Sequence, residues 1–240
     1  MALFNQNRDR FYTIQDTKLV SVTTVLNIVA KDALPPWYAR QERNLIITSL
    51  REALAEKAPG DVVQVDNLVE TVERIAGKKK AGDREKAKAA KRGKTAHTAI
   101  ECALRGDTMP PLTDADQRLF DAWWTWWKAT GFVVLDVEKV VFDMTLGYAG
   151  TMDVRAKHNK HGIVVLDWKS GKNIYSEAYL QNVAYRAAGK TMGLDSDMGA
   201  VIRLTYDGPV VGVCDDNKHT MKDFEAALNL WTWRHRNERN

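Results

Sequence analysis

The chain has 240 residues, of which 45% are hydrophobic and 28% are charged, enough for one elaborated domain or two small domains with a buried core. The polar N-terminus has no apolar stretch typical of a signal peptide, and no run approaches the roughly 20 apolar residues that a membrane helix needs. We therefore expect no membrane partner and a location in the cytoplasm, which is the host cytoplasm if a phage encodes the chain. The net charge of +4 is only mildly basic.

Positive charge is concentrated in one segment. Between Lys78 and Lys94, nine Lys or Arg residues stand against two acidic ones, so this segment carries +7 and the rest of the chain −3. A concentrated positive patch suits a phosphate backbone, although a solvated helix face explains the same charge equally well. On the first interpretation, four lysines are candidate contacts to DNA: Lys79, Lys80, Lys86 and Lys88.

The first third of the chain predicts a mixed region of strand and helix. The segment Leu19–Val29 is rich in β-branched residues and predicts a strand. Helical spacing follows over residues 37–57 and again over residues 66–75, where Gly77 stops the second helix. We therefore expect residues 1–82 to form an N-terminal strand and helix region, and residues 83–240 to form the main domain.

Helices and strands alternate in the remainder. Strong helix formers predict one long helix over residues 83–105, and Thr113 is a candidate cap for a second helix that ends at Gly131. The later order predicts an α/β fold with a central mixed sheet flanked by helices. The expected strands are 132–142, 148–156, 163–168, 200–206 and 210–213, and the expected helices are 175–191 and 221–236.

The expected helix between Thr113 and Gly131 contains four tryptophans within five residues. Helical spacing spreads them over more than one face, so they cannot all be buried against one surface. We expect most of them in the core, and the alternative is a platform on which nucleic-acid bases stack. The four residues are Trp123, Trp124, Trp126 and Trp127.

The strongest candidate site lies on two neighbouring strands. Asp167 and Lys169 are two residues apart at the end of an apolar strand, so their side chains project to the same face. If this strand pairs with the previous one as a hairpin, Asp153 reaches the same pocket. Two carboxylates suit Mg²⁺ or Mn²⁺, and the lysine could act on the attacking water or stabilise charge on a phosphate. The alternative is an ordinary ion pair at a strand end.

Two helical pairs accompany this site. His97 and Glu101 are four residues apart and lie on one helix face, so a neutral imidazole could complete a metal shell. A structural histidine is the alternative. Gln181 and Tyr185 have the same spacing on the helix after Lys169, where they could contact the phosphate or base of a substrate. A polar helix face explains this pair about as well.

Taken in order, these motifs resemble the RecB-like branch of the PD-(D/E)xK nuclease superfamily. Order and spacing agree over roughly residues 90–206, and Val22–Leu26, with Leu34 and Trp37, looks like the start of phage-encoded and mitochondrial-genome-maintenance-type exonucleases of this branch. The matching residues are Gly93, His97, Glu101, Glu138, Gly150, Asp153, Asp167, Lys169, Gln181 and Tyr185.

The resemblance implies a restriction-endonuclease-like core with an N-terminal helical elaboration. It further implies a metal held by His97, Asp153, Asp167 and the main-chain carbonyl of Trp168. Lys169 would be the catalytic lysine, and DNA would lie against Gln181 and Tyr185. Met152 stands where the family nominally has proline. Some relatives bind an iron–sulfur cluster through several cysteines, but this chain has only Cys102 and Cys214, so we expect Mg²⁺ or Mn²⁺ and no cluster.

The expected function is therefore a metal-dependent DNA exonuclease that acts on single-stranded DNA or DNA ends in recombination, repair or replication. A structure-specific or restriction-type endonuclease on the same core is the alternative within enzymes. A catalytically inactive DNA-binding module is the alternative outside them, and the intact set of Asp153, Asp167 and Lys169 argues against it. A purely structural protein would explain neither the basic segment nor the ordered motifs.

Overall fold

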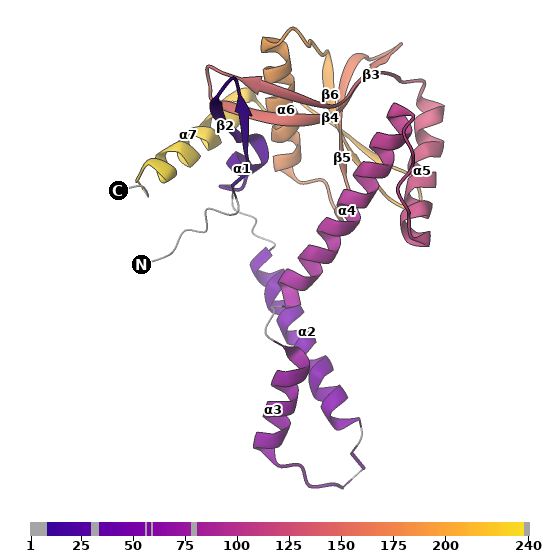
Figure 1. The fold of residues 1–240 in the computed structure, drawn as a ribbon, viewed down its shortest axis with the longest axis vertical. Coiled ribbons are helices and arrows are strands. Elements are labelled where there is room, and N and C mark those ends of the chain that lie inside the picture. Colours follow the sequence, from indigo (N-terminus) through magenta and orange to yellow (C-terminus); the bar gives the residue numbers. More distant parts are fainter. Residues whose placement is uncertain (1–8, 30–33, 56, 59, 78–80, 238–240) are drawn as a thin grey trace. The chain divides into compact units, whose positions relative to one another are not determined.

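The computed structural model describes residues 9–29, 34–55, 57–58, 60–77 and 81–237 (Figure 1). The chain divides into two compact units. The sheet unit comprises residues 1–29 and 92–240, and the helical unit comprises residues 30–91. This division differs from the expected boundary after residue 82, because the first strands join the sheet of the later residues and the long helix α4, Ala81–Arg105, contributes to both units.

The helical unit consists of α2 (Leu34–Leu54), α3 (Val65–Ala76) and the start of α4. The ring of Tyr38 lies against Gly82, where a Cβ atom would collide with it, and its hydroxyl donates to a carboxylate oxygen of Asp83 at 3.2 Å. The absence of a side chain at Gly82 therefore lets α2 approach α4 closely.

The sheet unit contains a seven-stranded mixed sheet. Parallel pairing joins β2 to β4 and β5 to β6, and the other neighbouring strands pair antiparallel. The strands are β1 (Phe11–Ile14), β2 (Thr17–Ser21), β3 (Val133–Asp143), β4 (Tyr148–His158), β5 (Gly162–Lys169), β6 (Met198–Arg203) and β7 (Val210–Val213). The helices are α1 (Val22–Leu26), the second half of α4, α5 (Asp114–Thr130), α6 (Ser176–Thr191) and α7 (Met221–Asn237).

Helices cover both faces of the sheet and create two hydrophobic cores (Figure 1). The core on the α6 face includes Tyr148, Tyr185 and Phe224, and it joins α1, α6 and α7 to the sheet. The core on the α5 face includes Ile100 and Trp168, and it joins α4 and α5 to the sheet. The α/β architecture with a mixed sheet flanked by helices is therefore confirmed.

The sheet has a gap along one edge of β4. On this edge, β2 pairs with Tyr148 and Ala149, and β5 pairs with residues 154–158. In the registers of the described strands, neither neighbour pairs with residues 150–153, while β3 continues along the other edge. A segment of β4 that ends at Asp153 is therefore left open between two neighbouring strands.

The same segment coincides with a change of face in β3 and β4. Residues two apart on a regular strand face the same side, yet Met152 belongs to the α6-face core and Val154 to the α5-face core. Their partners on β3 are Lys139 and Val137, and the intervening Glu138 has a φ of +49°. A non-glycine residue in the left-handed region is strained, and such strain is often found at functional sites. Both strands therefore change face where Glu138 and Asp153 lie.

The expected strand over Leu19–Val29 is wrong in its second half. Strand β2 ends at Ser21, and α1 begins at Val22 despite the β-branched residues there. The hydroxyl of Ser21 accepts a hydrogen bond from the amide of Thr24 at 3.1 Å, which caps the helix. The cap and the burial of Val22 and Val25 outweigh the intrinsic β preference of this segment.

The tryptophans of α5 belong to the core. Trp123 and Trp127 are buried, and Trp124 and Trp126 pack against the same core while half-buried. Trp123, Trp126 and Trp127 all meet the ring of Trp168 edge-on, with centroids 5.7–6.5 Å apart. This packing fixes the strand that carries Asp167 and Lys169. No described helix is long and apolar enough to cross a membrane.

We predict that Trp123→Ala lowers the free energy of unfolding by about 3–5 kcal/mol, because it removes a fully buried ring at the centre of this packing. The matched control is Trp233→Ala on α7, which removes the same side chain where it is 64% exposed and should cost less than about 1 kcal/mol. Urea denaturation followed by circular dichroism measures both. Equal losses of unfolding free energy would mean that the burial of Trp123 does not stabilise the α5-face core.

Candidate metal centre

The carboxylate of Asp153 lies where β4 and β5 separate. The last pair of their ladder is Val154 with Leu166, and one step further an oxygen of Asp153 accepts the backbone amide of Trp168 at 2.7 Å. The two strands do form an antiparallel hairpin, as the sequence suggested. A side chain, instead of the next backbone pair, holds the strands together at this position. Asp153 is therefore fixed in orientation and mostly buried.

Three potential ligands converge at this carboxylate. His97 on α4 places its Nδ1 atom 3.7 Å from Oδ2 of Asp153. Ligand atoms of His97, Glu138 and Asp153 all lie within 4.8 Å of one another. Close approach of α4 to the sheet allows this, since a Cβ atom at Gly93 would stand 2.6 Å from the hydroxyl of Ser170. One imidazole and two carboxylates are a donor set that suits a divalent cation.

Glu138 has a strongly perturbed carboxyl group. Burial, and to a smaller extent the negative charges of Asp153 and Glu101, raise its pKa from 4.5 to about 7, while Arg105 opposes the shift. The strained backbone at Glu138 directs its carboxylate towards that of Asp153. Apart from the family resemblance, no sequence pattern predicts this arrangement, since a single glutamate in a strand gives no sign of an unusual φ.

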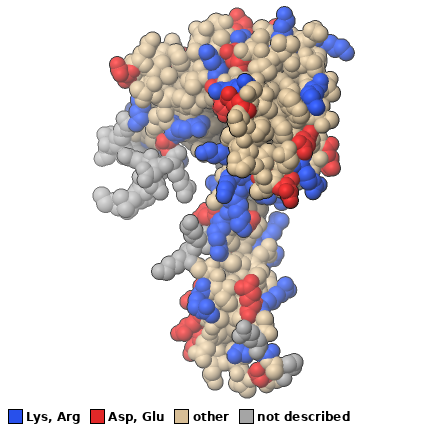
Figure 2. Space-filling view, turned by 45° about the vertical axis from the view of Figure 1, so that its right-hand side comes forward, with Lys and Arg blue, Asp and Glu red and all other residues tan. Residues whose placement is uncertain are grey.

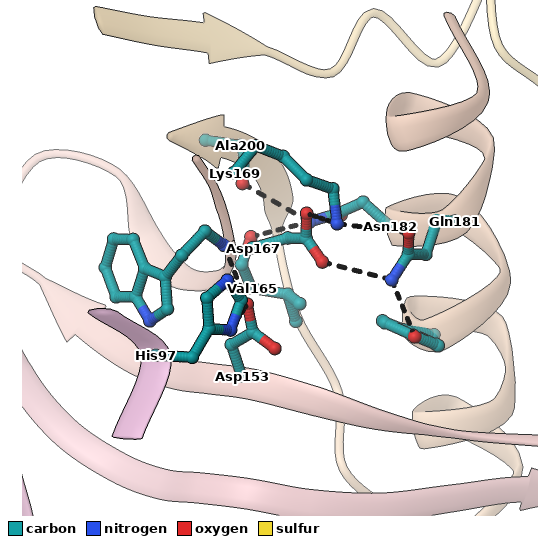
Figure 3. Close-up of polar contacts among 10 residues, drawn as sticks. His97, Asp153, Val165, Asp167, Lys169, Gln181, Asn182 and Ala200 are labelled. Carbon is teal, nitrogen blue, oxygen red and sulfur yellow. Dashed lines mark hydrogen bonds and ion pairs between the residues drawn. The ribbon is translucent and has the colours of Figure 1, made fainter. Parts of the chain in front are cut away.

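Asp167 and Lys169 form a second group beside the first (Figure 3). The ammonium of Lys169 lies 2.6 Å from Oδ2 of Asp167 and donates to the amide oxygen of Gln181 at 3.1 Å. The amide nitrogen of Gln181 in turn donates to Asp167 at 3.2 Å and to the hydroxyl of Tyr185 at 2.7 Å. Gly150 makes room for the Tyr185 ring, which a Cβ atom there would meet. The four side chains are therefore held in one network.

The charges in this network stabilise one another. Burial raises the pKa of Asp167 to about 6, although the neighbouring ammonium of Lys169 opposes the shift. Burial disfavours the ammonium of Lys169, but the carboxylates of Asp167 and Asp153 outweigh it and raise the pKa of this lysine. The neighbouring carboxylates therefore favour the charged form of Lys169, which suits this residue to stabilising negative charge more than to accepting a proton.

The structure thus distributes the expected metal ligands over two adjacent groups. His97 and Asp153 lie in the first, together with Glu138, while Asp167 faces Lys169 and Gln181 in the second. The main chain of Trp168 runs between them, with its ring in the core. Glu101 does not belong to the three-residue group, and its carboxylate pairs with Arg105 at 3.1 Å.

Two of the four lysines expected to contact DNA are among the residues that the structure describes. Lys79 and Lys80 fall outside the described residues. Lys86 and Lys88 belong to the helical unit, are exposed on α4, and Lys88 pairs with Glu85 at 2.9 Å. Figure 2 shows a group of basic side chains along this part of the molecule. The exposed basic residues of α4 are Lys86, Lys88, Lys91, Arg92, Lys94 and Arg105.

Sequence reasoning did not predict that β1 contacts the open segment of β4. The hydroxyl of Tyr12 lies 3.0 Å from that of Thr151, within the open segment of β4, and the guanidinium of Arg10 stands over the Tyr12 ring. Strand β1 therefore borders the gap beside Asp153. No local pattern links Tyr12 to Thr151, because 139 positions separate them and the contact depends on the pairing of β2 with β4.

No protein-family model and no curated protein matches this chain. The function therefore has to be inferred from the residues of the site and their geometry.

We predict that Glu138→Gln stabilises the metal-free protein at high pH. The pKa of Glu138 is higher in the folded chain than its ordinary 4.5, so its ionisation reduces stability as pH rises from 4.5 through 7, and the penalty is complete above 7. After discounting for solvent screening we expect roughly 1 kcal/mol, or about 2–4 °C in Tm.

Thermal melting in EDTA tests this expectation, with a larger gain at pH 8 than at pH 5. The control is Glu70→Gln, which makes the same change at an exposed position of α3. A variant that melts below the wild type at pH 8 would contradict the electrostatic cause that we assign to Glu138.

Proposed function

We propose that this protein is a metal-dependent deoxyribonuclease that hydrolyses phosphodiester bonds, with an exonuclease acting on single strands or DNA ends as the favoured form. The observation that carries this proposal is the junction of two groups at one gap in the sheet. One is a cation-binding set of His97, Glu138 and Asp153, and the other is a lysine kept charged beside Asp167. The order of these residues along the chain is that of the RecB-like nuclease motifs.

The residues of the first group fit a divalent metal. Their donors are hard carboxylate oxygens and an imidazole nitrogen, and Glu138, whose pKa is raised by burial and then by Asp153 and Glu101, would be more stable in its ionised form beside a cation. His97, Glu138 and Asp153 would hold Mg²⁺ or Mn²⁺, with Asp167 next to them. When bound, the ion would supply Lewis acidity towards a phosphoryl oxygen and an acidified water for the attack.

The chain's own contribution to the reaction is electrostatic and geometric. Hydrolysis adds water in line to phosphorus and breaks the bond to the 3′-oxygen, leaving a 5′-phosphate and a 3′-hydroxyl. Negative charge grows on the phosphoryl oxygens in the transition state, and a fixed ammonium stabilises that charge in a dry site. Lys169 has this role, and Gln181 with Tyr185 holds it in position.

The choice of DNA as the substrate rests on charge and motif order. In the sheet unit, Arg92 and Lys94 are exposed on α4 just before His97, and a polyanionic strand is a fitting partner for such cations. A structure-specific or restriction-type endonuclease would use the same residues, so the ends of the substrate decide between the two. A catalytically inactive DNA-binding module is disfavoured by the complete acidic and basic set.

We predict that Lys169→Ala lowers the rate of cleavage by about 100-fold or more, because one charge that acts in the transition state is lost. Binding of Mn²⁺ and DNA should be nearly unchanged, since a single ammonium contributes little to backbone affinity. Lys172→Ala removes the same charge at an exposed position three residues away and should retain activity. Single-turnover cleavage of a labelled strand and calorimetry of Mn²⁺ binding give both readouts.

A Lys169→Ala enzyme that keeps more than about a tenth of the wild-type rate would contradict the role assigned to this residue. Asp153→Asn should behave differently, because it keeps the hydrogen bond to Trp168 but replaces a charged ligand with a neutral amide. Both Mn²⁺ binding and cleavage should then be lost. Full Mn²⁺ binding by Asp153→Asn would place the metal elsewhere.

We predict that a circular single strand resists the enzyme, while a linear strand of the same sequence is degraded in Mg²⁺ or Mn²⁺. An exonuclease needs an end to enter its site, and the circle has none. Gel electrophoresis of both substrates, with EDTA as the control, gives the result. Rapid linearisation of the circle would favour the endonuclease. Strands that stay intact in every condition would favour the catalytically inactive DNA-binding module.

A further inference from the structure

An apolar groove lies on the α5 face of the sheet, away from the proposed metal centre. It has a volume of about 590 Å³. Its floor is formed by aliphatic side chains of three adjacent strands, and one wall is formed by the end of α5 with Phe132. The floor residues are Val164, Leu166, Met198, Ala200, Ile202, Val211 and Val213.

The outer part of this floor has no helix over it in the part of the chain that the structure describes. Val213 and Val211 on β7 are 57% and 47% exposed, whereas their neighbours Ala200 and Ile202 on β6 are buried. Strand β7 is also the last strand of the sheet, so its outer edge is unpaired among the described strands. Aliphatic side chains that face water beside a free edge are typical of an interaction surface.

The end of the groove at the β4–β5 turn holds one ammonium group and two imidazole rings, and Nδ1 of His158 accepts the backbone amide of Lys160 at 3.1 Å. Lys160, His158 and His161 line it, and no Asp or Glu is found among the lining residues that the structure describes. The two imidazole rings stack with centroids 4.7 Å apart, and His158 also packs on Phe132 at 5.0 Å. The ammonium of Lys160 is exposed and has no ion pair among the described residues.

We propose that this groove binds a short acidic peptide segment of a partner protein, with bulky apolar side chains on the floor and carboxylates at the basic turn. A volume of this size accommodates a few large side chains. Charge complementarity at the turn specifies acidic flanking residues. A nucleic acid fits less well, because a phosphate backbone needs several cations and the floor is aliphatic. This docking site does not depend on the proposed nuclease activity.

A fluorescein-labelled octapeptide that alternates Leu and Phe with Asp and Glu serves as the probe, and binding is measured by fluorescence anisotropy. The full chain should bind this peptide, but neither the peptide with Lys in place of the acids nor the peptide with Ser in place of the apolar residues. Val213→Glu and Lys160→Glu should each weaken binding at least tenfold. Val210→Glu is the matched control, because Val210 is also exposed on β7 but pairs with Arg203 on the opposite face.

Four outcomes would overturn the proposal. One is no binding at about 100 μM peptide, which is weaker than a specific peptide site requires. A second is equal loss of binding in Val210→Glu and Val213→Glu with unchanged melting temperatures. A third is displacement of the peptide by single-stranded DNA. The fourth is a wild-type dimer that Val213→Glu converts to a monomer in sedimentation velocity, which would assign the groove to a second copy of this chain.

Discussion

The hydrogen bond from the backbone amide of Trp168 to the Asp153 carboxylate sets the arrangement of the whole site. Without it, the amide of a buried residue would lack a partner where β4 and β5 separate, at a cost of about 1–3 kcal/mol. The same bond ends the β4–β5 ladder and fixes one oxygen of Asp153. The strands can therefore open next to Asp167 while the sheet remains continuous on either side. Asp153 therefore satisfies the buried amide of Trp168 and also occupies a candidate ligand position.

Opening the sheet at this point lets residues from both helix layers reach two neighbouring carboxylates, Asp153 and Asp167. His97 arrives with α4 on the α5 face, and Gln181 and Tyr185 arrive with α6 on the other face. Neither layer could contribute to a site on the opposite face of an unbroken sheet. The strain at Glu138 and the buried charges reduce stability locally, and the tryptophan packing around Trp168 offsets that cost nearby. The tryptophan core around Trp168 and the strained residue Glu138 are thus adjacent in the sheet unit.

Much of this could be predicted from local sequence patterns, and the exceptions share a physical cause. Periodicity located nearly every helix and strand, and two-residue spacing placed Asp167 and Lys169 on one face. The helix α1 was missed because a side-chain cap at Ser21 and burial outweigh β propensity. The part of Glu138 in the three-residue group could not be predicted from spacing, because its position depends on a left-handed residue within a strand. The role of Tyr12 was invisible because long-range strand pairing brings it to the gap. Local preferences therefore give the elements, whereas the breaks in regular pairing that create the site follow from tertiary packing.

Charge balance connects the two groups at the site and explains why a cation would be required. Three carboxylates, those of Glu138, Asp153 and Asp167, stand against the one ammonium of Lys169, which leaves two negative charges when all are ionised. A phosphodiester is itself an anion and would be repelled by this excess. A divalent cation held by the first group would bring the total to zero, and the ammonium of Lys169 would then face the incoming phosphate. On the proposed function, metal binding is therefore a condition for substrate binding at the centre as well as for chemistry. The raised pKa of Glu138, caused first by burial and then by Asp153 and Glu101, shows how unfavourable its ionised carboxyl group is in the chain alone.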